Sequence, residues 1–385
     1  MILNSIEFHE NPGEPLEWQL NGLTLESINL LVGRNATGKT RTLGVIGTLS
    51  RLLSGEQQPK SLAANYSAVL TNGPQEYAYQ LRIAGGKVDS EILSIDGKAV
   101  LKRGEGGYGT IFAEKLNGGT ELEFQSPTDE IAAVSRRDSI QHPYLQPLND
   151  WAKSVRHYHF GTALGKDHAV MHGDERLQDV DGRDADKVIR VFEKGRQDYG
   201  EGFVNELIQD LQSIDYPLEA IDTGEPVSFQ LTDSSAPRFR FLRVKESGIN
   251  GLTDQNAMSQ GMFRVVSLLI LVNYASRFAT PTCVLVDDIG EGLDFSRSCR
   301  LIDLLREKAE NSKMQLIMST NDRFVMNQVP LQEWSVLERS GGIVTVKNYK
   351  NSRDQFEEFR FTGLSNFSLL ETDFLNSPHA MATAQ

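Results

Sequence analysis

The feature that most constrains this chain is the octapeptide GRNATGKT, residues 33–40. It has the spacing G-x-x-x-x-G-K-[ST], and the apolar run 28–32 directly precedes it. The run predicts a buried strand, and apolar residues recur at helical spacing over 41–53. In a strand, loop and helix of this kind, backbone N–H groups and a helix N-terminus can surround phosphate oxygens. A chance match in a turn is the alternative, but both flanks favour a phosphate loop.

We therefore expect this loop to bind the triphosphate of a nucleotide. Lys39 would reach the β- and γ-phosphates, and the Thr40 hydroxyl would be a ligand of Mg²⁺. The rest of the loop would contact phosphate oxygens through exposed backbone N–H groups. Its residues are Gly33, Arg34, Asn35, Ala36, Thr37 and Gly38.

A second apolar run, CVLVDD at residues 283–288, ends in two carboxylates. A phosphate loop needs a Mg²⁺ partner, which a second strand would deliver at its carboxyl end beside the loop. Asp287 is the expected Mg²⁺-associated acid, and Asp288 would hold the attacking water. Turn and helix-capping aspartates are also common after strands. Two acids in a chain that already has a phosphate loop favour the catalytic interpretation.

Sequence patterns outside these motifs predict a mixed α/β organisation. The length of 385 residues suits about two domains, or one large sheet-based domain with an insertion. Short β-type runs between glycine-containing turns over 67–124 predict an antiparallel meander, and 185–214 predicts an amphipathic helix interrupted near Gly200. Beyond residue 262, helices and strands alternate as in a mainly parallel sheet. The runs WSVLER and GIVTVKNY are expected to form an edge hairpin.

Charge and hydropathy restrict the functional class. The formal net charge of −13 argues against a generally basic surface that coats nucleic acid. A local exception is RFRFLRVK, residues 238–245, where one strand face is expected to carry the positive charges. A solvated strand face is the simpler interpretation of this series, and a DNA-binding face is the alternative. Without a long apolar run or a secretory N-terminal pattern, we expect a cytoplasmic protein that does not bind a membrane.

Four histidines fall close together in the sequence, so a metal site has to be considered. They are His157, His159, His168 and His172. No fixed Cys or carboxylate spacing joins them, and the two cysteines of the chain form no Cys-x-x-Cys pair. Surface or core histidines are therefore the favoured interpretation.

The motifs together resemble the ABC-type ATPases, specifically the RecF-, SMC- and OLD-like branch. Four segments carry the resemblance in this order: GRNATGKT, AMSQGMFR at 257–264, CVLVDDIGEGLD at 283–294 and QLIMSTND at 315–322. Ser259 and Gly261 match the family's signature motif. Asp294, six residues after Asp288, matches its D-loop aspartate. The distance from Lys39 to Ser259 is long for a transporter ATPase and allows an antiparallel lobe and inserted helices.

The resemblance implies an α/β fold: a P-loop ABC-type ATPase head with a mainly parallel sheet, an antiparallel β lobe and a short helical insertion. Lobe I, with the phosphate loop and the meander, would span residues 1–160. A helical insertion with strands would span 161–245, and lobe II, with the signature and the D-loop, would span 246–349. Residues 350–385 would form a C-terminal tail.

The resemblance also implies ATP and Mg²⁺ as cofactors and a homodimer or higher homo-oligomer. Two copies would pack head to tail, so that Ser259 and Gly261 of one meet the γ-phosphate held by the other. Two departures from the family predict slow hydrolysis: Asp288 replaces the usual glutamate, and Asn321 replaces the usual histidine. The Q-loop glutamine stays open between Gln141 and Gln146.

Stand-alone proteins that resemble this one and lack a nuclease domain often occur in bacterial antiviral systems beside a nuclease or toxin. The resemblance therefore implies a sensor or scaffold for a separately encoded effector. The apolar residues of the tail segment 361–375 suggest a docking element, although such residues more often pack on their own domain. The alternative is a RecF-like DNA-repair ATPase that binds duplex DNA directly. An intrinsic nuclease of the OLD type is not expected, because only about 60 residues follow Asp322.

Overall fold

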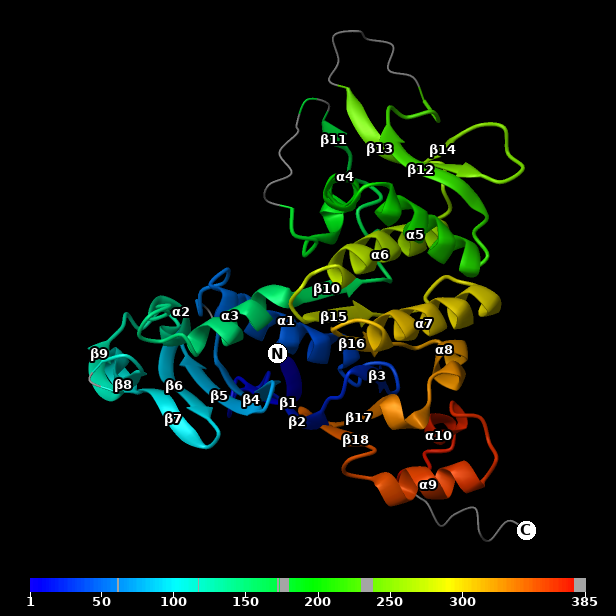
Figure 1. Ribbon diagram of the computed structural model, residues 1–385. Helices are drawn as coiled ribbons and strands as arrows, with labels where there is room; N and C mark the ends of the chain where they lie inside the picture. Colours follow the sequence, from blue (N-terminus) through cyan, green and yellow to red (C-terminus); the bar gives the residue numbers. More distant parts are fainter. Residues whose placement is uncertain (61, 117, 172, 174–179, 230–237, 377–385) are drawn as a thin grey trace. The chain divides into compact units, whose positions relative to one another are not determined.

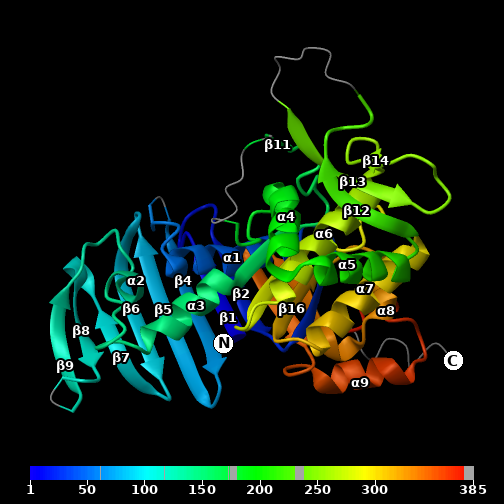
Figure 2. The same cartoon turned by 45° about the horizontal axis from the view of Figure 1, so that its top comes forward.

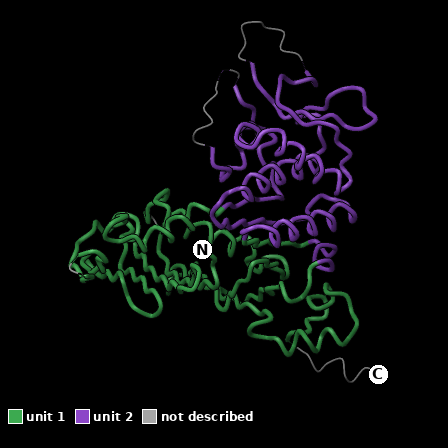
Figure 3. Tube along the Cα trace, in the orientation of Figure 1, with its two compact units in different colours: residues 1–155, 315–321, 329–385 green, residues 156–314, 322–328 purple. Residues whose placement is uncertain are grey.

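The computed structural model describes the chain except for residues 61, 117, 172, 174–179, 230–237 and 377–385. The chain divides into two compact units, which Figure 3 colours separately. Unit 1 comprises residues 1–155, 315–321 and 329–385, and unit 2 comprises 156–314 and 322–328. The four-part division expected from the sequence stays a prediction.

Unit 1 is built on a long mixed sheet whose strands are labelled in Figure 1. The strand before the phosphate loop, β3 (Ile28–Val32), is buried at every position. It pairs in parallel with β16 (Met314–Ser319) on one side and with β17 (Trp334–Ser340) on the other. Next to β17 is the antiparallel β18 (Ile343–Asn348), which pairs in parallel with β2 (Trp18–Thr24). The phosphate-loop strand is therefore an interior strand with parallel neighbours.

The hairpin expected from WSVLER and GIVTVKNY exists as β17 and β18, but its edge position is wrong. Both strands pair on their outer sides, β17 with β3 and β18 with β2. These partners lie about three hundred residues earlier in the chain, so local turn and alternation patterns carry no information about them.

The antiparallel part of the sheet confirms the predicted meander. It follows the order β2-β1-β4-β5-β6-β7-β8-β9, and each neighbouring pair is antiparallel. The strand bounds are β1 (Ile2–Glu10), β4 (Ala64–Asn72), β5 (Gln75–Ala84), β6 (Lys87–Ile95), β7 (Lys98–Arg103), β8 (Tyr108–Ala113) and β9 (Thr120–Gln125).

Helices of unit 1 pack on this sheet and on each other. Helix α1 (Lys39–Ser54) follows the phosphate loop and contacts α3 (Leu145–Ser154), where Asn149 donates a hydrogen bond to the Leu53 carbonyl at 2.9 Å. Figure 2 shows α3 beside the antiparallel strands. The remaining elements are α2 (Ala132–Ser135), α9 (Arg353–Phe361), α10 (Ser368–Glu371) and the 3₁₀ helices Glu105–Gly107 and Leu331–Glu333.

Unit 2 is organised around α6 (Gln260–Ser276), which is apolar and buried on nearly all sides of its middle turns. Gly200, with φ 65°, separates α4 (Val188–Tyr199) from α5 (Glu201–Ser213), which confirms the predicted interruption. Strand β15 (Thr282–Asp287) is buried throughout and neighbours β10 (Val155–His159). Further helices are α7 (Phe295–Glu310), α8 (Arg323–Gln328) and the 3₁₀ helix Ala185–Lys187.

Unit 2 also contains a small antiparallel sheet with the order β11-β13-β12, in which β14 pairs with β13. The bounds are β11 (Val170–Met171), β12 (Leu218–Gly224), β13 (Phe239–Glu246) and β14 (Thr253–Asp254). Across both units, none of the helices in the described residues combines the length and the apolar character needed to cross a membrane.

All residues of the basic series RFRFLRVK except Arg238 lie on β13, but the expected single positive face is wrong. Side chains alternate between the two faces of a strand, and Arg240 and Arg243 are three positions apart, so they lie on opposite faces. Each is paired with an acid: Arg240 with Glu193 and Arg243 with Asp222, both at 2.8 Å. Local carboxylates therefore neutralise much of this basic segment.

Candidate nucleotide-binding site

The phosphate loop connects β3 to α1 and contains two residues in the left-handed backbone region. Ala36 has φ 64°, and Gly38, which caps α1, has φ 103°. Such alternation of backbone hand turns successive N–H groups into one concavity. The first N–H groups of α1 also lack partners within the helix, so the loop presents backbone donors to an anion.

Lys39 lies within this loop. Its side chain is buried, with only 6% of the residue exposed, and Nζ donates to the carbonyls of Gly33 at 2.9 Å and Arg34 at 3.3 Å. Arg34, Asn35 and Thr40 are exposed. The loop therefore combines a fixed ammonium group with accessible polar side chains.

Three residues outside the motif support the loop, and sequence reasoning missed them. A Cβ atom on Gly38 would lie 3.2 Å from the Trp18 ring, and one on Gly33 would lie 2.7 Å from the Leu337 carbonyl oxygen. Arg339 donates to the Ala36 carbonyl at 3.2 Å. These contacts depend on the pairing of β17 and β18 with distant strands, so no local signal could have identified them.

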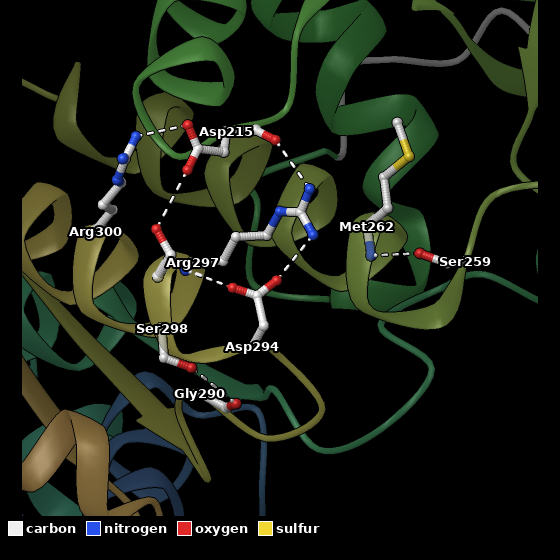
Figure 4. Close-up of polar contacts among 9 residues, drawn as sticks. Asp215, Ser259, Met262, Gly290, Asp294, Arg297, Ser298 and Arg300 are labelled. Carbon is white, nitrogen blue, oxygen red and sulfur yellow. Dashed lines mark hydrogen bonds and ion pairs between the residues drawn. The ribbon is translucent and has the colours of Figure 1, made fainter.

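In unit 2, the predicted signature residues lie at the start of α6. Ser259 is the N-cap, and its Oγ accepts a hydrogen bond from the Met262 N–H at 3.2 Å (Figure 4). A Cβ atom on Gly261 would lie 3.1 Å from the Gly292 carbonyl oxygen. The absence of a side chain at Gly261 lets the helix start approach the loop that contains Asp294, and Ser259 itself is exposed.

Asp294 caps α7 through a compact polar network (Figure 4). It accepts hydrogen bonds from the Arg297 N–H at 3.0 Å and from Arg297 Nη1 at 2.9 Å. The other Arg297 nitrogen donates to the carbonyl of Asp215, whose carboxylate contacts Arg300 at 2.6 Å. The backbone hydrogen bond from Arg297, followed by the positive charge of its guanidinium, holds the pKa of Asp294 below its ordinary value.

This cap leads to a stability prediction. Asp294→Ala should lower the free energy of unfolding by about 1 kcal/mol, because the N-cap acceptor is lost. Asp294→Asn keeps an acceptor and should lose much less. Urea unfolding of the three proteins measures the difference. Equal losses in both variants would show that the exposed charge pair, rather than the cap, is the stabilising contact.

The two aspartates that end β15 differ in environment. Asp287 is buried, its backbone carbonyl accepts from the Phe160 N–H at 2.9 Å, and its carboxylate lies 3.5 Å from His159 Nδ1. Asp288 is partly exposed and has φ 54°, a left-handed conformation that aspartate tolerates better than glutamate does. This conformation offers a physical reason for aspartate, rather than glutamate, at this position.

Arg264 connects the turn that follows β15 to the loop at residues 161–162. Arg264 on α6 donates to the carbonyls of Gly161 at 2.6 Å, Thr162 at 2.9 Å and Glu291 at 3.2 Å. A Cβ atom on Gly161 would lie 2.5 Å from the Glu291 carboxylate. Arg264 belongs to the signature segment AMSQGMFR, but the hydrogen bonds by which it joins these two loops were not predicted.

Asn321 and the two Q-loop candidates, Gln141 and Gln146, are the remaining predicted site residues. Asn321 is exposed and lies two residues after the end of β16. The next residue, Asp322, accepts from the Phe324 N–H at 2.7 Å at the start of α8. Gln141 is exposed, and the Gln146 side chain donates to Asp150 at 2.6 Å, so the Q-loop assignment stays open.

The histidine segment shows two local contacts. The rings of His157 and His159 are 4.2 Å apart, and His168 lies 3.7 Å from Asp186, while His172 lies outside the described residues. Within the part of the chain that the structure describes, no three His, Cys, Asp or Glu residues are grouped as metal ligands.

Comparisons with known proteins identify the fold. No family model matches the sequence, and no curated protein matches it. Among solved structures, the chain is similar to the SMC head bound to the C-winged helix domain of ScpA. The identity is 12% and the TM-score 0.50, over 90% of this chain and 97% of that chain. The chain has the fold of an SMC head. This mixed α/β architecture agrees with the fold class that the motifs predicted.

Two further solved structures are similar to this head fold. The SMC head domain from Thermotoga maritima is 14% identical, with a TM-score of 0.46 over 90% of this chain and 99% of that chain. The SMC head with an extended coiled coil from Pyrococcus furiosus, bound to the C-terminal domain of ScpA, is 12% identical. Its TM-score is 0.48, over 93% of this chain and 99% of that chain.

Proposed function

We propose that this protein binds ATP with Mg²⁺, hydrolyses it slowly and pairs with a second copy around the nucleotide. The observation that carries the proposal is the phosphate loop, where the ammonium group of Lys39 is held at 2.9 Å from the Gly33 carbonyl. Left-handed Ala36 and Gly38 add a concavity of backbone donors next to the N-terminus of α1. An anionic polyphosphate is the ligand that this arrangement suits best.

The side chains expected at the metal fit Mg²⁺. Thr40 offers a hydroxyl and Asp287 a carboxylate, and both are oxygen ligands of the kind that Mg²⁺ prefers. When bound, the ion would neutralise negative charge on the β- and γ-phosphates. Lys39 would bind those phosphates directly, and Asp288 would orient the attacking water. Asn321 could donate a hydrogen bond to phosphate but carries no charge.

Hydrolysis should depend on Asp288 in a specific way. Asp288→Asn should lower kcat about a hundred-fold or more while leaving ATP binding in place, because the group that accepts the proton of water is lost. Asp288→Glu should hydrolyse faster than the natural chain, since the carboxylate reaches further. The glutamate should also reduce stability by about 1 kcal/mol, because it tolerates the left-handed backbone poorly.

Phosphate release under saturating MgATP measures this prediction, with Glu291→Gln as the control in the same turn. The control should keep the activity of the natural chain. Loss of activity in Glu291→Gln but not in Asp288→Asn would show that Glu291, rather than Asp288, has the catalytic role. A natural chain as fast as vigorous ABC ATPases would contradict the expected slow turnover.

The proposed biological role is that of a sensor or scaffold for a separately encoded nuclease or toxin in antiphage defence. This part rests on the resemblance to stand-alone ATPases of such systems. Exposed apolar side chains near the C-terminus offer a contact surface for a partner, since Phe361 is 89% exposed and Leu364 45%. Co-purification with the products of neighbouring genes, with and without ATP, tests the role. A nuclease or toxin retained only with ATP would support it.

Direct binding of duplex DNA, as in a RecF-like repair ATPase, has less support. The arginines that suggested a DNA-binding face on β13 are paired with Glu193 and Asp222. Bound DNA without a partner protein in the same purification would favour this alternative. Salt-dependent affinity would then identify phosphate contacts.

A further inference from the structure

The C-terminal segment, residues 366–376, is attached to unit 1 by apolar packing. Leu369, Phe374 and Leu375 are almost completely buried, with 1%, 3% and 3% exposed. The Phe374 ring contacts that of Phe359 on α9 at 5.2 Å, edge to face. At the start of the segment, Asn366 donates to the Val329 carbonyl at 2.9 Å. The segment is therefore an integral part of unit 1.

A polar junction joins the end of this segment to β17 and β18. Asn376 donates to the Glu338 carboxylate at 3.0 Å. Lys347 lies 3.1 Å from the same carboxylate and donates to Asn376 at 2.5 Å and to the Leu375 carbonyl at 3.1 Å. Glu338 is thus held by two side chains, one from the segment and one from β18.

The residues on either side of Glu338 contact the phosphate loop. The Leu337 carbonyl oxygen lies 2.7 Å from the position that a Cβ atom on Gly33 would occupy. Arg339 donates to the carbonyl of Ala36, the left-handed residue of the loop, at 3.2 Å. A displacement of Glu338 would therefore shift two neighbours that support the loop.

A cavity of about 210 Å³ lies where the loop and the segment approach one another. Its lining includes Gly33 and Thr37 of the loop, Leu337 of β17, and Leu370 and Asn376 of the segment. A space of this size exceeds that of one water molecule, so close packing does not fix this side of the loop. On this side, the position of the phosphate loop then depends on its contacts with Leu337 and Arg339 of β17.

We propose that the C-terminal segment positions the phosphate loop through Glu338, so that its attachment controls how long ATP is retained. The inference rests on the proposed function, because it takes ATP as the ligand of the loop. Asn376 and Glu338 are positioning residues here, since they act on the nucleotide only through β17. The proposal predicts that removing the contact between Asn376 and Glu338 changes the rate of nucleotide release more than the accompanying change in folding stability would explain.

The test compares Asn376→Ala with Asn366→Ala in the full chain. Both variants remove asparagine side-chain hydrogen bonds from the same segment, but only Asn376 contacts Glu338. Asn366→Ala removes the bond to the Val329 carbonyl, whereas Asn376→Ala also removes the contacts with Lys347 and Asp373. Asn376→Ala should release a fluorescent ATP analogue, bound with Mg²⁺, about ten-fold faster in stopped flow. Asn366→Ala should release it at the natural rate. The melting temperatures of both variants show how much of any change in release follows from a loss of folding stability.

A third variant tests the opposite direction. Leu370→Phe adds volume at the cavity and should slow release, because a filled space restricts the loop. If the natural chain and all three variants release the nucleotide at the same rate, this inference is wrong, while the proposed function is unaffected. Failure of the natural chain to bind MgATP overturns the proposed function and this inference with it. If Leu370→Phe does not fold, as judged by circular dichroism, the comparison of Asn376→Ala with Asn366→Ala tests the inference by itself.

Discussion

Replacing Lys39 with alanine is expected to abolish ATP binding at micromolar nucleotide. The Lys39 side chain is buried, and its Nζ lies within hydrogen-bond distance of the Gly33 and Arg34 carbonyls at the centre of the loop. A cation fixed there would contact phosphate in a partly desolvated site. Removing one partner of such a charge pair costs about 2–5 kcal/mol, which weakens binding roughly 30-fold to several thousand-fold.

Isothermal titration calorimetry with MgATP measures the loss, and Lys102→Ala serves as the control. Lys102 is an exposed lysine on β7 of the antiparallel lobe, so its removal changes net charge equally without touching the loop. Melting temperatures should stay within a few degrees of the natural chain. If Lys39→Ala retains nucleotide as well as Lys102→Ala does, the phosphate-loop assignment is wrong.

Local features of the fold were predictable from the sequence because they depend on neighbouring residues. The apolar run 28–32 is a fully buried strand, and the turn after it starts α1 at Lys39. The helix interruption at Gly200 was equally local, since a positive φ there favours glycine. Ser259 and Asp294 cap α6 and α7, and both belong to motifs that precede a helix.

Features that depend on distant pairing were not predictable in this way. The pairing of β18 with β2 makes the hairpin an interior element, and nothing within residues 334–349 specifies that partner. The face assignment on β13 failed for a different reason. The arginines at 240 and 243 were grouped by charge, whereas strand geometry separates residues an odd number apart.

The candidate site shows the same division between local and distant information. Motif residues were identified from short segments, but the supporting contacts of Leu337 and Arg339 come from a strand three hundred residues away. The chemical roles of Asp287, Asp288, Asn321 and the signature residues stay predictions. Binding and turnover measurements on single variants are what can assign them.

Replacing Ser259 with aspartate is expected to abolish ATP-dependent pairing while leaving ATP binding intact. In the proposed head-to-tail pair, the exposed end of α6 in one copy faces the γ-phosphate held by the other. Aspartate is as good an N-cap as serine, so α6 should keep the hydrogen bond from the Met262 N–H. Its negative charge would oppose the γ-phosphate, and like charges in contact cost several kcal/mol. A C2 pair contains two such contacts, which doubles the effect.

The decisive comparison is Ser259→Asp against Ser259→Asn, each combined with Asp288→Asn to slow hydrolysis. Asparagine has nearly the same shape and also caps helices, so the two variants differ only in charge. Light scattering after size-exclusion chromatography in MgATP should show a pair for the asparagine variant and a single copy for the aspartate variant. Both should bind nucleotide with the affinity of the Asp288→Asn protein, because the phosphate loop is unchanged. A pair formed equally well by the aspartate variant would mean that Ser259 does not face phosphate, and the head-to-tail arrangement would have to be abandoned even if ATP binding at Lys39 is sound.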